Sequence, residues 1–159
     1  MKLDKATVML KIVLALGAIA LGLVLLGGVP GYMSHVIHVR PSLRGWDFWM
    51  KAYATLISLP VWAVIVILWM VFDTLPKNEA FTMVNVTRFR WIARLAVVDL
   101  VLVSVLGAFL VISGVTPAFL MMCVLLAVCG GLVVTIVFQV LAGLLQNAVQ
   151  LKQDSDMTI

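Results

Sequence analysis

The sequence predicts an all-α membrane protein, a polytopic bundle of four transmembrane helices with both termini in the cytoplasm. Hydrophobic residues make up 64% of the 159 residues, and the mean hydropathy is +1.20. Charged residues account for only 11%, whereas about 25% is usual in soluble domains. The apolar residues form four long stretches, and these are the expected spans: residues 12–29, 53–72, 91–112 and 118–145.

Each stretch is about as long as the roughly 20 residues that a helix needs to cross a bilayer at about 1.5 Å per residue. Unpaired backbone amides are costly in lipid, so segments this apolar must be helical. The four spans leave little chain for a separate soluble domain, and we expect one domain over residues 1–159. Basic residues that flank the spans explain the net charge of +4. Direct nucleic-acid binding is therefore not expected.

The first span follows Lys2, Lys5 and Lys11, an arrangement that also begins a secretory signal peptide. Its apolar core is longer than that of a typical signal, and residues 27–30 make a poor cleavage site. We therefore expect this span to remain as an anchor. It also contains Ala18 and Gly22, whose spacing is compatible with self-association between helices.

The first loop, residues 30–52, is expected to be the main external segment. Its aromatic residues favour the headgroup region, and residues 45–53 fit a stretch that lies along the membrane surface. An aromatic belt and a ligand-binding lid are the two alternatives. His35 and His38 have i, i+3 spacing, but no third ligand accompanies them. No metal or cofactor is expected.

The second loop begins at Asp73, and the third helix is expected to start before the membrane, with residues 85–90 as its cytoplasmic base. The third loop, residues 113–117, is so short that the third and fourth spans must form an antiparallel hairpin. Basic residues are more numerous on the side of the two termini, which predicts the cytoplasmic (inner) membrane with both ends inside. The eight on that side are Lys2, Lys5, Lys11, Lys77, Arg88, Arg90, Arg94 and Lys152, against Arg40, Arg44 and Lys51 on the other.

Asp99 is the one carboxylate well inside a span. Such a group is expected to face the bundle interior or to have a partner. Gln139 of the fourth span lies at a similar depth, in a row at i+4 spacing that includes Thr135. We expect an intramembrane polar contact between the two helices through Asp99, Gln139 and Thr135. The alternative is a proton or cation site in a small transporter or channel component.

No nucleophile–base pair, metal-ligand pattern or phosphate-binding glycine loop is apparent in the sequence, so it does not predict an enzyme. An intramembrane activity without a known motif remains a third alternative.

Two stretches resemble a known family. Residues 80–92 read AFTMVNVTRFRWI, and residues 144–159 read LLQNAVQLKQDSDMTI. Both are similar to motifs of the YoaS-like family of small four-helix bacterial membrane proteins (domain of unknown function 2975). Its members are often encoded beside a small helix-turn-helix regulator. The resemblance therefore implies a regulatory or interaction protein with a small DNA-binding regulator as its partner. The implied cytoplasmic interaction surface consists of Asn85, Arg88, Arg90, Asp154 and Asp156.

Overall fold

The computed structural model describes residues 2–39, 45–76, 81–114 and 118–157. Within these ranges the chain is helical and contains no β-strand, so the predicted all-α class is confirmed. The elements are α1 (Lys2–Gly22), the π-helical segment η1 (Leu23–Gly28), α2 (Val29–Val39), α3 (Asp47–Phe72), α4 (Met83–Ile112) and α5 (Ala118–Met157).

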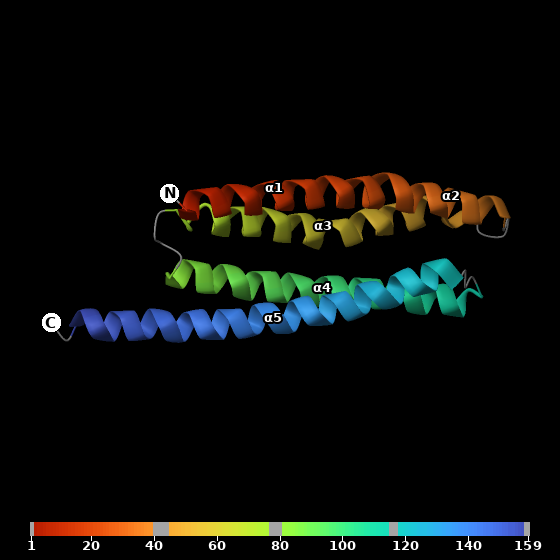
Figure 1. Ribbon diagram of the computed structural model, residues 1–159. Coiled ribbons are helices and arrows are strands. Elements are labelled where there is room, and N and C mark those ends of the chain that lie inside the picture. The colour runs from red at the N-terminus through yellow and green to blue at the C-terminus, as the bar shows by residue number, and fades with distance from the viewer. Residues whose placement is uncertain (1, 40–44, 77–80, 115–117, 158–159) are drawn as a thin grey trace.

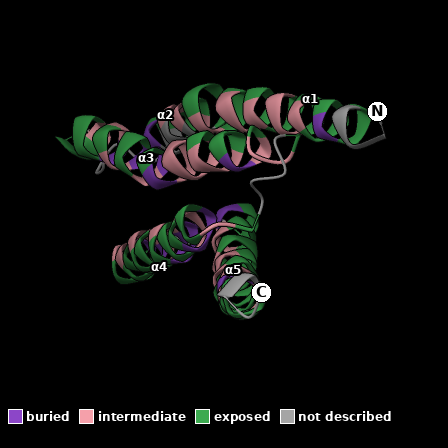
Figure 2. Cartoon of the chain, turned by 90° about the vertical axis from the view of Figure 1, so that its left-hand side faces the viewer, coloured by how far each residue is buried: buried purple, intermediate pink, exposed green. Residues whose placement is uncertain are grey.

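The helices lie side by side in two antiparallel pairs. Figure 1 shows that α1, η1 and α2 continue into one another as a single rod, and that α3 returns along it. The helices α4 and α5 form the second pair, and the two pairs make two layers (Figure 2). The N-terminus, the end of α3, the start of α4 and the C-terminus lie at one end of the bundle, which we call the terminal end. We call the opposite end the far end.

Four helical segments are long and apolar enough to cross a membrane, as predicted. They are Lys5–Tyr32, Asp47–Phe72, Met83–Ile112 and Ala118–Ser155. The predicted span limits at Phe72, Ile112 and Ala118 coincide with helix limits in the structure. The other limits lie further out, because a helix can continue into the polar region beyond the lipid wherever its residues tolerate helical geometry.

The predicted first loop, residues 30–52, is wrong over most of its length. Residues up to Val39 belong to α2, and α3 already begins at Asp47. Within residues 45–53, which were expected to lie along the membrane surface, residues 47–53 form the first turns of α3 and continue into its span. The connection between the two helices is therefore much shorter than the sequence suggested.

The first helical rod continues through Pro30 because the residues before it form a π-helical segment instead of an α-helical turn. Proline has no backbone N–H and its ring crowds the preceding turn, which normally ends or kinks an α-helix. Here η1 directly precedes α2, and Pro30 lies in the first turn of α2, where proline is tolerated. In membrane helices, local π-helical adjustments help to satisfy the backbone groups that a proline leaves without partners. Ser34 Oγ donates a hydrogen bond to the Pro30 carbonyl oxygen at 3.0 Å.

Close approach between α4 and α5 depends on small residues. A Cβ atom added at Gly107 would lie 2.9 Å from Val124 Cγ1, and one added at Gly131 would lie 3.6 Å from Leu100 Cβ. Small residues at such crossings let helix backbones approach closely in lipid, where dispersion contacts between well-packed helices drive association. The helices α4 and α5 are therefore closely packed at these two positions.

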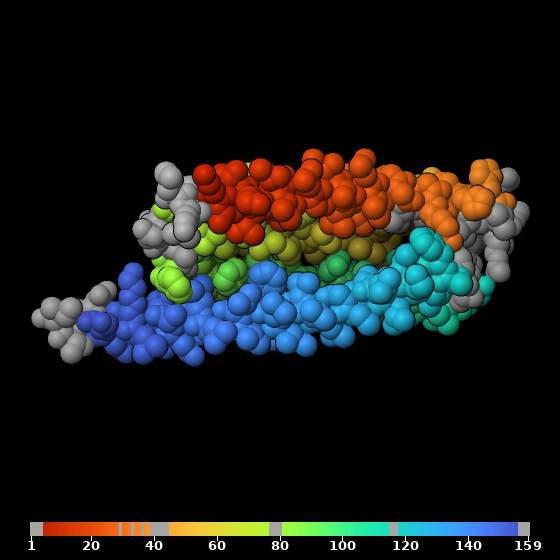
Figure 3. Space-filling model, viewed as in Figure 1, coloured from red at the N-terminus to blue at the C-terminus, as the bar shows by residue number. Residues whose placement is uncertain are grey.

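The remaining surface suits a lipid environment. Large apolar side chains such as Val13, Leu16 and Ile136 are more than half exposed, and exposed residues cover the outward sides of the helices (Figure 2). Figure 3 shows a recess between the α1–α2 rod and α5. There, an apolar cavity of about 470 Å³ is lined by residues of η1, α2, α3, α4 and α5. In a bilayer, acyl chains are the solvent that meets these surfaces.

Candidate functional site

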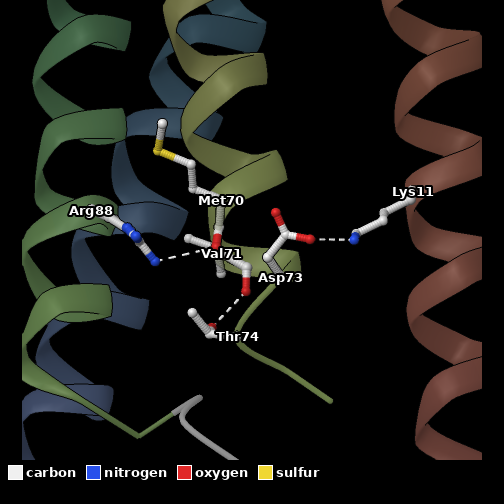
Figure 4. Close-up of polar contacts among 6 residues, drawn as sticks. All are labelled: Lys11, Met70, Val71, Asp73, Thr74 and Arg88. Atoms are coloured by element: carbon white, nitrogen blue, oxygen red, sulfur yellow. Dashed lines mark hydrogen bonds and ion pairs between the residues drawn. The ribbon is translucent and has the colours of Figure 1, made fainter. Parts of the chain in front are cut away.

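Polar contacts from three helices surround the last turn of α3 at the terminal end. Lys11 Nζ on α1 forms an ion pair with Asp73 Oδ1. Arg88 Nη1 on α4 donates a hydrogen bond to the Met70 carbonyl oxygen at 3.2 Å (Figure 4). Together with Thr74 and Asn85, these side chains form what we call the α3-end cluster: Lys11, Asp73, Thr74, Asn85 and Arg88.

Asn85 occupies the centre of this cluster. Its side-chain Nδ2 donates to Thr74 Oγ1 at 2.8 Å, and its Oδ1 accepts from Arg88 Nη1 at 2.9 Å. Thr74 Oγ1 in turn donates to the Val71 carbonyl oxygen at 2.6 Å. Asn85 is only 1% exposed. The predicted interaction surface included Asn85 as an exposed residue, and this is corrected: its amide bonds inside the bundle.

The electrostatics of the C-terminal end of α3 favour positively charged side chains at this position. The last carbonyl groups of α3 have no partner within the helix, and the helix dipole places partial negative charge at that end. Lys11 and Arg88 bring positive charge to it, and Lys11 Nζ also lies 5.5 Å from the Trp69 ring centroid. Asp73 caps α3 with its backbone N–H. The negative carboxylate of Asp73 is unfavourable at the negative end of the helix dipole, and the ion pair with Lys11 compensates for this. The cluster thus fixes α1 and α4 to the end of α3.

The other predicted surface residues lie on α4 and α5. Arg90 is exposed, and its Nη2 donates to Gln146 Oε1 at 2.6 Å, which joins α4 to α5. Asp154 is exposed near the end of α5. Asp156 belongs to the same helix, but its side chain lies outside the described residues. Arg90 and Asp154 are therefore on the surface, in contrast to Asn85.

Asp99 does not form the predicted hydrogen bond with Gln139. Asp99 Oδ1 is buried and has no hydrogen-bond partner in the part of the chain that the structure describes. Leu100, the next residue, is the one that opposes Gly131 of α5. Successive helical residues point about 100° apart, so Asp99 is turned away from α5.

The face of α4 that carries Asp99 packs against α3. Asn85 and Arg88 on this face bond to the end of α3, and Tyr53 Oη of α3 donates to the Leu102 carbonyl oxygen at 2.9 Å. Asn85, Arg88 and Asp99 do share one face, as predicted. The predicted neighbour of this face was wrong, because the face packs against α3 and not against α5.

Gln139 and Thr135 on α5 do not contact Asp99 through hydrogen bonds in the described structure. Thr135 Oγ1 donates to the Gly131 carbonyl oxygen of its own helix at 2.8 Å, so its donor is already used. Gln139 is exposed and lines a groove between α4 and α5 that also contains Arg90 and Arg94. The sequence prediction did not single out Arg94 as a site residue. The i, i+4 spacing of the two arginines, which puts them on one helix face, was the signal that could have found it.

Two expectations about the first helices can also be compared with the structure. Gly22 packs against α3 of the same chain, where an added Cβ would lie 3.2 Å from Trp62 Cζ2. This residue thus contributes to packing within the bundle. His35 and His38 are exposed on α2. Among the described residues, no group of three or more His, Cys, Asp or Glu side chains is placed to hold a metal ion.

These features define a class: a multi-pass membrane protein of four helical spans, with a polar cluster at the terminal end and a carboxylate in the third span. The family model described as "Protein of unknown function (DUF2975)" matches residues 38–159, about three quarters of the chain. The chain belongs to this family. Comparisons with curated proteins and with solved structures gave no match.

Proposed function

We propose that this protein is a membrane-embedded regulatory protein that binds a small soluble DNA-binding regulator at its terminal end, and not a catalyst. The observation that supports this proposal most directly is the length of α5. It has 40 residues, against 30 in α4, which correspond to about 60 and 45 Å. Figure 1 shows α5 extending past the other helices at the terminal end.

The projecting part begins after Val149, which is 4% exposed and is the last buried residue among the described side chains of α5. We call residues 150–157 the docking segment. Its described side chains, residues 150–155, are all exposed. Leu151 among them is 70% exposed, between polar neighbours. A leucine presented on a polar helix fits recognition in which a helix places apolar side chains into a partner's groove.

The terminal end is proposed to face the cytoplasm of the cell membrane. In the sequence, the segments on the side of the two termini carry eight basic residues and the segment between the first two spans carries three, and such an excess marks cytoplasmic segments. A cytoplasmic docking segment would be accessible to a DNA-binding protein. The choice of partner rests on the resemblance of residues 144–159, which include this segment, to a family often encoded beside helix-turn-helix regulators.

Co-purification tests the proposal. The tagged full chain is solubilised from its own host, and the proteins retained are compared with those retained by a variant lacking residues 150–159. The expected result is a DNA-binding regulator that is recovered with the full chain, lost on truncation and reduced at least tenfold by Leu151→Ser. Gln150→Ser, an exposed change on the same turn, should leave recovery unchanged. Equal recovery with the truncated chain would contradict the docking segment.

A second candidate function is transport, and one observation favours it. Asp99 Oδ1 is buried inside a span without a hydrogen-bond partner among the described residues, and intramembrane carboxylates commonly mark ion or proton pathways. Proteoliposomes with a pH-sensitive dye would measure proton flux. Asp99→Asn should abolish flux and Ser104→Ala should preserve it. Flux that is absent in the wild type, or unchanged by Asp99→Asn, would eliminate this candidate.

A further inference from the structure

A groove with two arginines opens between α4 and α5. Its volume is about 390 Å³, and the residues that line it are Arg90, Ala93, Arg94, Val97, Val98 and Gln139. Arg90, Arg94 and Gln139 are exposed, whereas Ala93 is buried and forms part of the floor. The groove thus combines two guanidinium groups and one amide with an apolar base.

Among the described residues, no carboxylate neutralises this charge. The lining contains no acidic residue, and neither arginine takes part in an ion pair in the part of the chain that the structure describes. Arg90 is held by Gln146 Oε1, and the Arg94 guanidinium carbon lies 5.4 Å from the Trp91 ring centroid. Both contacts orient the arginines without cancelling their charge, because Gln146 and Trp91 are neutral.

The groove lies at the depth of lipid phosphates. Arg94 is 18 residues from Ile112 at the far end of α4, and Gln139 is 21 residues from Ala118 at the start of α5. These separations correspond to about 27 and 31 Å, close to the thickness of the hydrocarbon core, which is about 30 Å. The groove is therefore at the boundary between hydrocarbon and headgroups. Half-exposed Trp91 beside it fits an interfacial aromatic position.

We propose that this groove binds the phosphodiester headgroup of an anionic phospholipid. Arg90 and Arg94 would share the phosphate oxygens, since guanidinium groups match phosphate geometry. The Gln139 amide would donate to an ester or glycerol oxygen, and one acyl chain would follow Val97 and Val98 into the bilayer. Basic pockets between transmembrane helices at the membrane surface are suited to such headgroups. This site is separate from the docking segment, and its occupancy does not depend on residues 150–159.

Native mass spectrometry of the purified full chain tests the proposal, with phosphatidylglycerol and phosphatidylcholine as probes. We expect tighter binding of phosphatidylglycerol and a loss of about fivefold for each of Arg90→Gln and Arg94→Gln, equivalent to roughly 1 kcal/mol per arginine. Arg94→Lys, which keeps the charge, should retain most of the binding. Lys152→Gln removes a positive charge from exposed α5 outside the groove and should leave binding unchanged.

Three results would overturn the proposal. Equal binding of the two lipids would exclude headgroup selection. A loss with Lys152→Gln as large as that with Arg94→Gln would show diffuse attraction rather than a site. Full displacement of phosphatidylglycerol by millimolar inorganic phosphate would show a site for free phosphate and not for a lipid. Circular dichroism of each variant separates lost binding from lost folding, and truncation after Val149 should leave lipid binding intact.

Discussion

Asn85 shows how one side chain can connect three parts of this bundle. Its amide bonds to Thr74 beyond the end of α3 and to Arg88, and Arg88 reaches back to a carbonyl group of α3. The amide is buried, so its hydrogen bonds have no water to replace them. A buried polar group left without a partner costs more than the bond itself contributes. The α3-end cluster therefore depends on Asn85 more than on its exposed ion pair.

Replacing Asn85 should destabilise the bundle. Asn85→Ala removes the donor that bonds to Thr74 Oγ1 and the acceptor that bonds to Arg88 Nη1, and we expect a loss of about 1–3 kcal/mol in the free energy of unfolding. Thr87→Ala is the control, because Thr87 is exposed and bonds only within its own helix in the described structure. Reversible unfolding in mixed micelles, titrated with SDS, measures both. An Asn85→Ala effect no larger than the control would contradict the cluster.

Asp99 and Gln139 should behave independently of each other. The structure places Asp99 on the face of α4 that meets α3, and Gln139 in an exposed groove. A double-mutant cycle with Asp99→Asn and Gln139→Leu should give a coupling energy within about 0.5 kcal/mol of zero. The same unfolding assay measures it. A coupling of about 1 kcal/mol or more would restore the contact that the sequence suggested.

At the scale of elements, α4 and α5 make the most extensive contact of any two described elements, and glycine makes their closest approach possible. Gly107 has no space for a side chain next to Val124, a β-branched residue with little freedom to move. Gly130 on α5 has no atom within 4 Å of the position that a Cβ would take. The two glycines therefore offer a matched comparison within one helix pair.

Gly107→Ala should lower the free energy of unfolding by about 1–3 kcal/mol, because the added methyl group would overfill the crossing. Gly130→Ala should be neutral or stabilising by up to about 1 kcal/mol, since alanine restricts the unfolded chain more than glycine does. The SDS titration distinguishes the two. Equal effects of the two substitutions would mean that α4 and α5 are not packed at this crossing as described.

Element limits could be predicted where chemistry changes abruptly. The limits at Phe72 and Ile112 precede polar or glycine-containing turns, and Pro117 comes directly before α5. The continuation through Pro30 could not be predicted, because a π-helical turn depends on packing rather than on composition. The prediction that Asp99 and Gln139 lie at similar depths was wrong, because Asp99 is 13 residues from Ile112 and Gln139 is 21 residues from Ala118, which correspond to about 20 and 31 Å from the far end. The neighbour that each helix face contacts depends on how all four helices pack together. The order of residues in one sequence does not determine that packing in a way that pattern analysis can predict.

At the scale of the whole molecule, the two layers and four crossings bring both ends of the chain to one end of the bundle (Figure 1). This arrangement places the α3-end cluster and the docking segment on the same side of the membrane. The arginine groove lies at the boundary of that side. The proposed function therefore requires the terminal end to face the cytoplasm, where a soluble regulator is present.

Cysteine accessibility in intact cells tests this orientation most directly. In a chain with Cys123→Ala and Cys129→Ala, single substitutions Ala6→Cys, Gly45→Cys and Ser155→Cys probe exposed positions near the N-terminus, the far end and the C-terminus. A membrane-impermeant maleimide should label Gly45→Cys in intact cells, and Ala6→Cys and Ser155→Cys only after permeabilisation. Labelling of Ala6→Cys and Ser155→Cys from opposite sides would contradict four crossings, and labelling of both in intact cells would place the docking segment outside the cell.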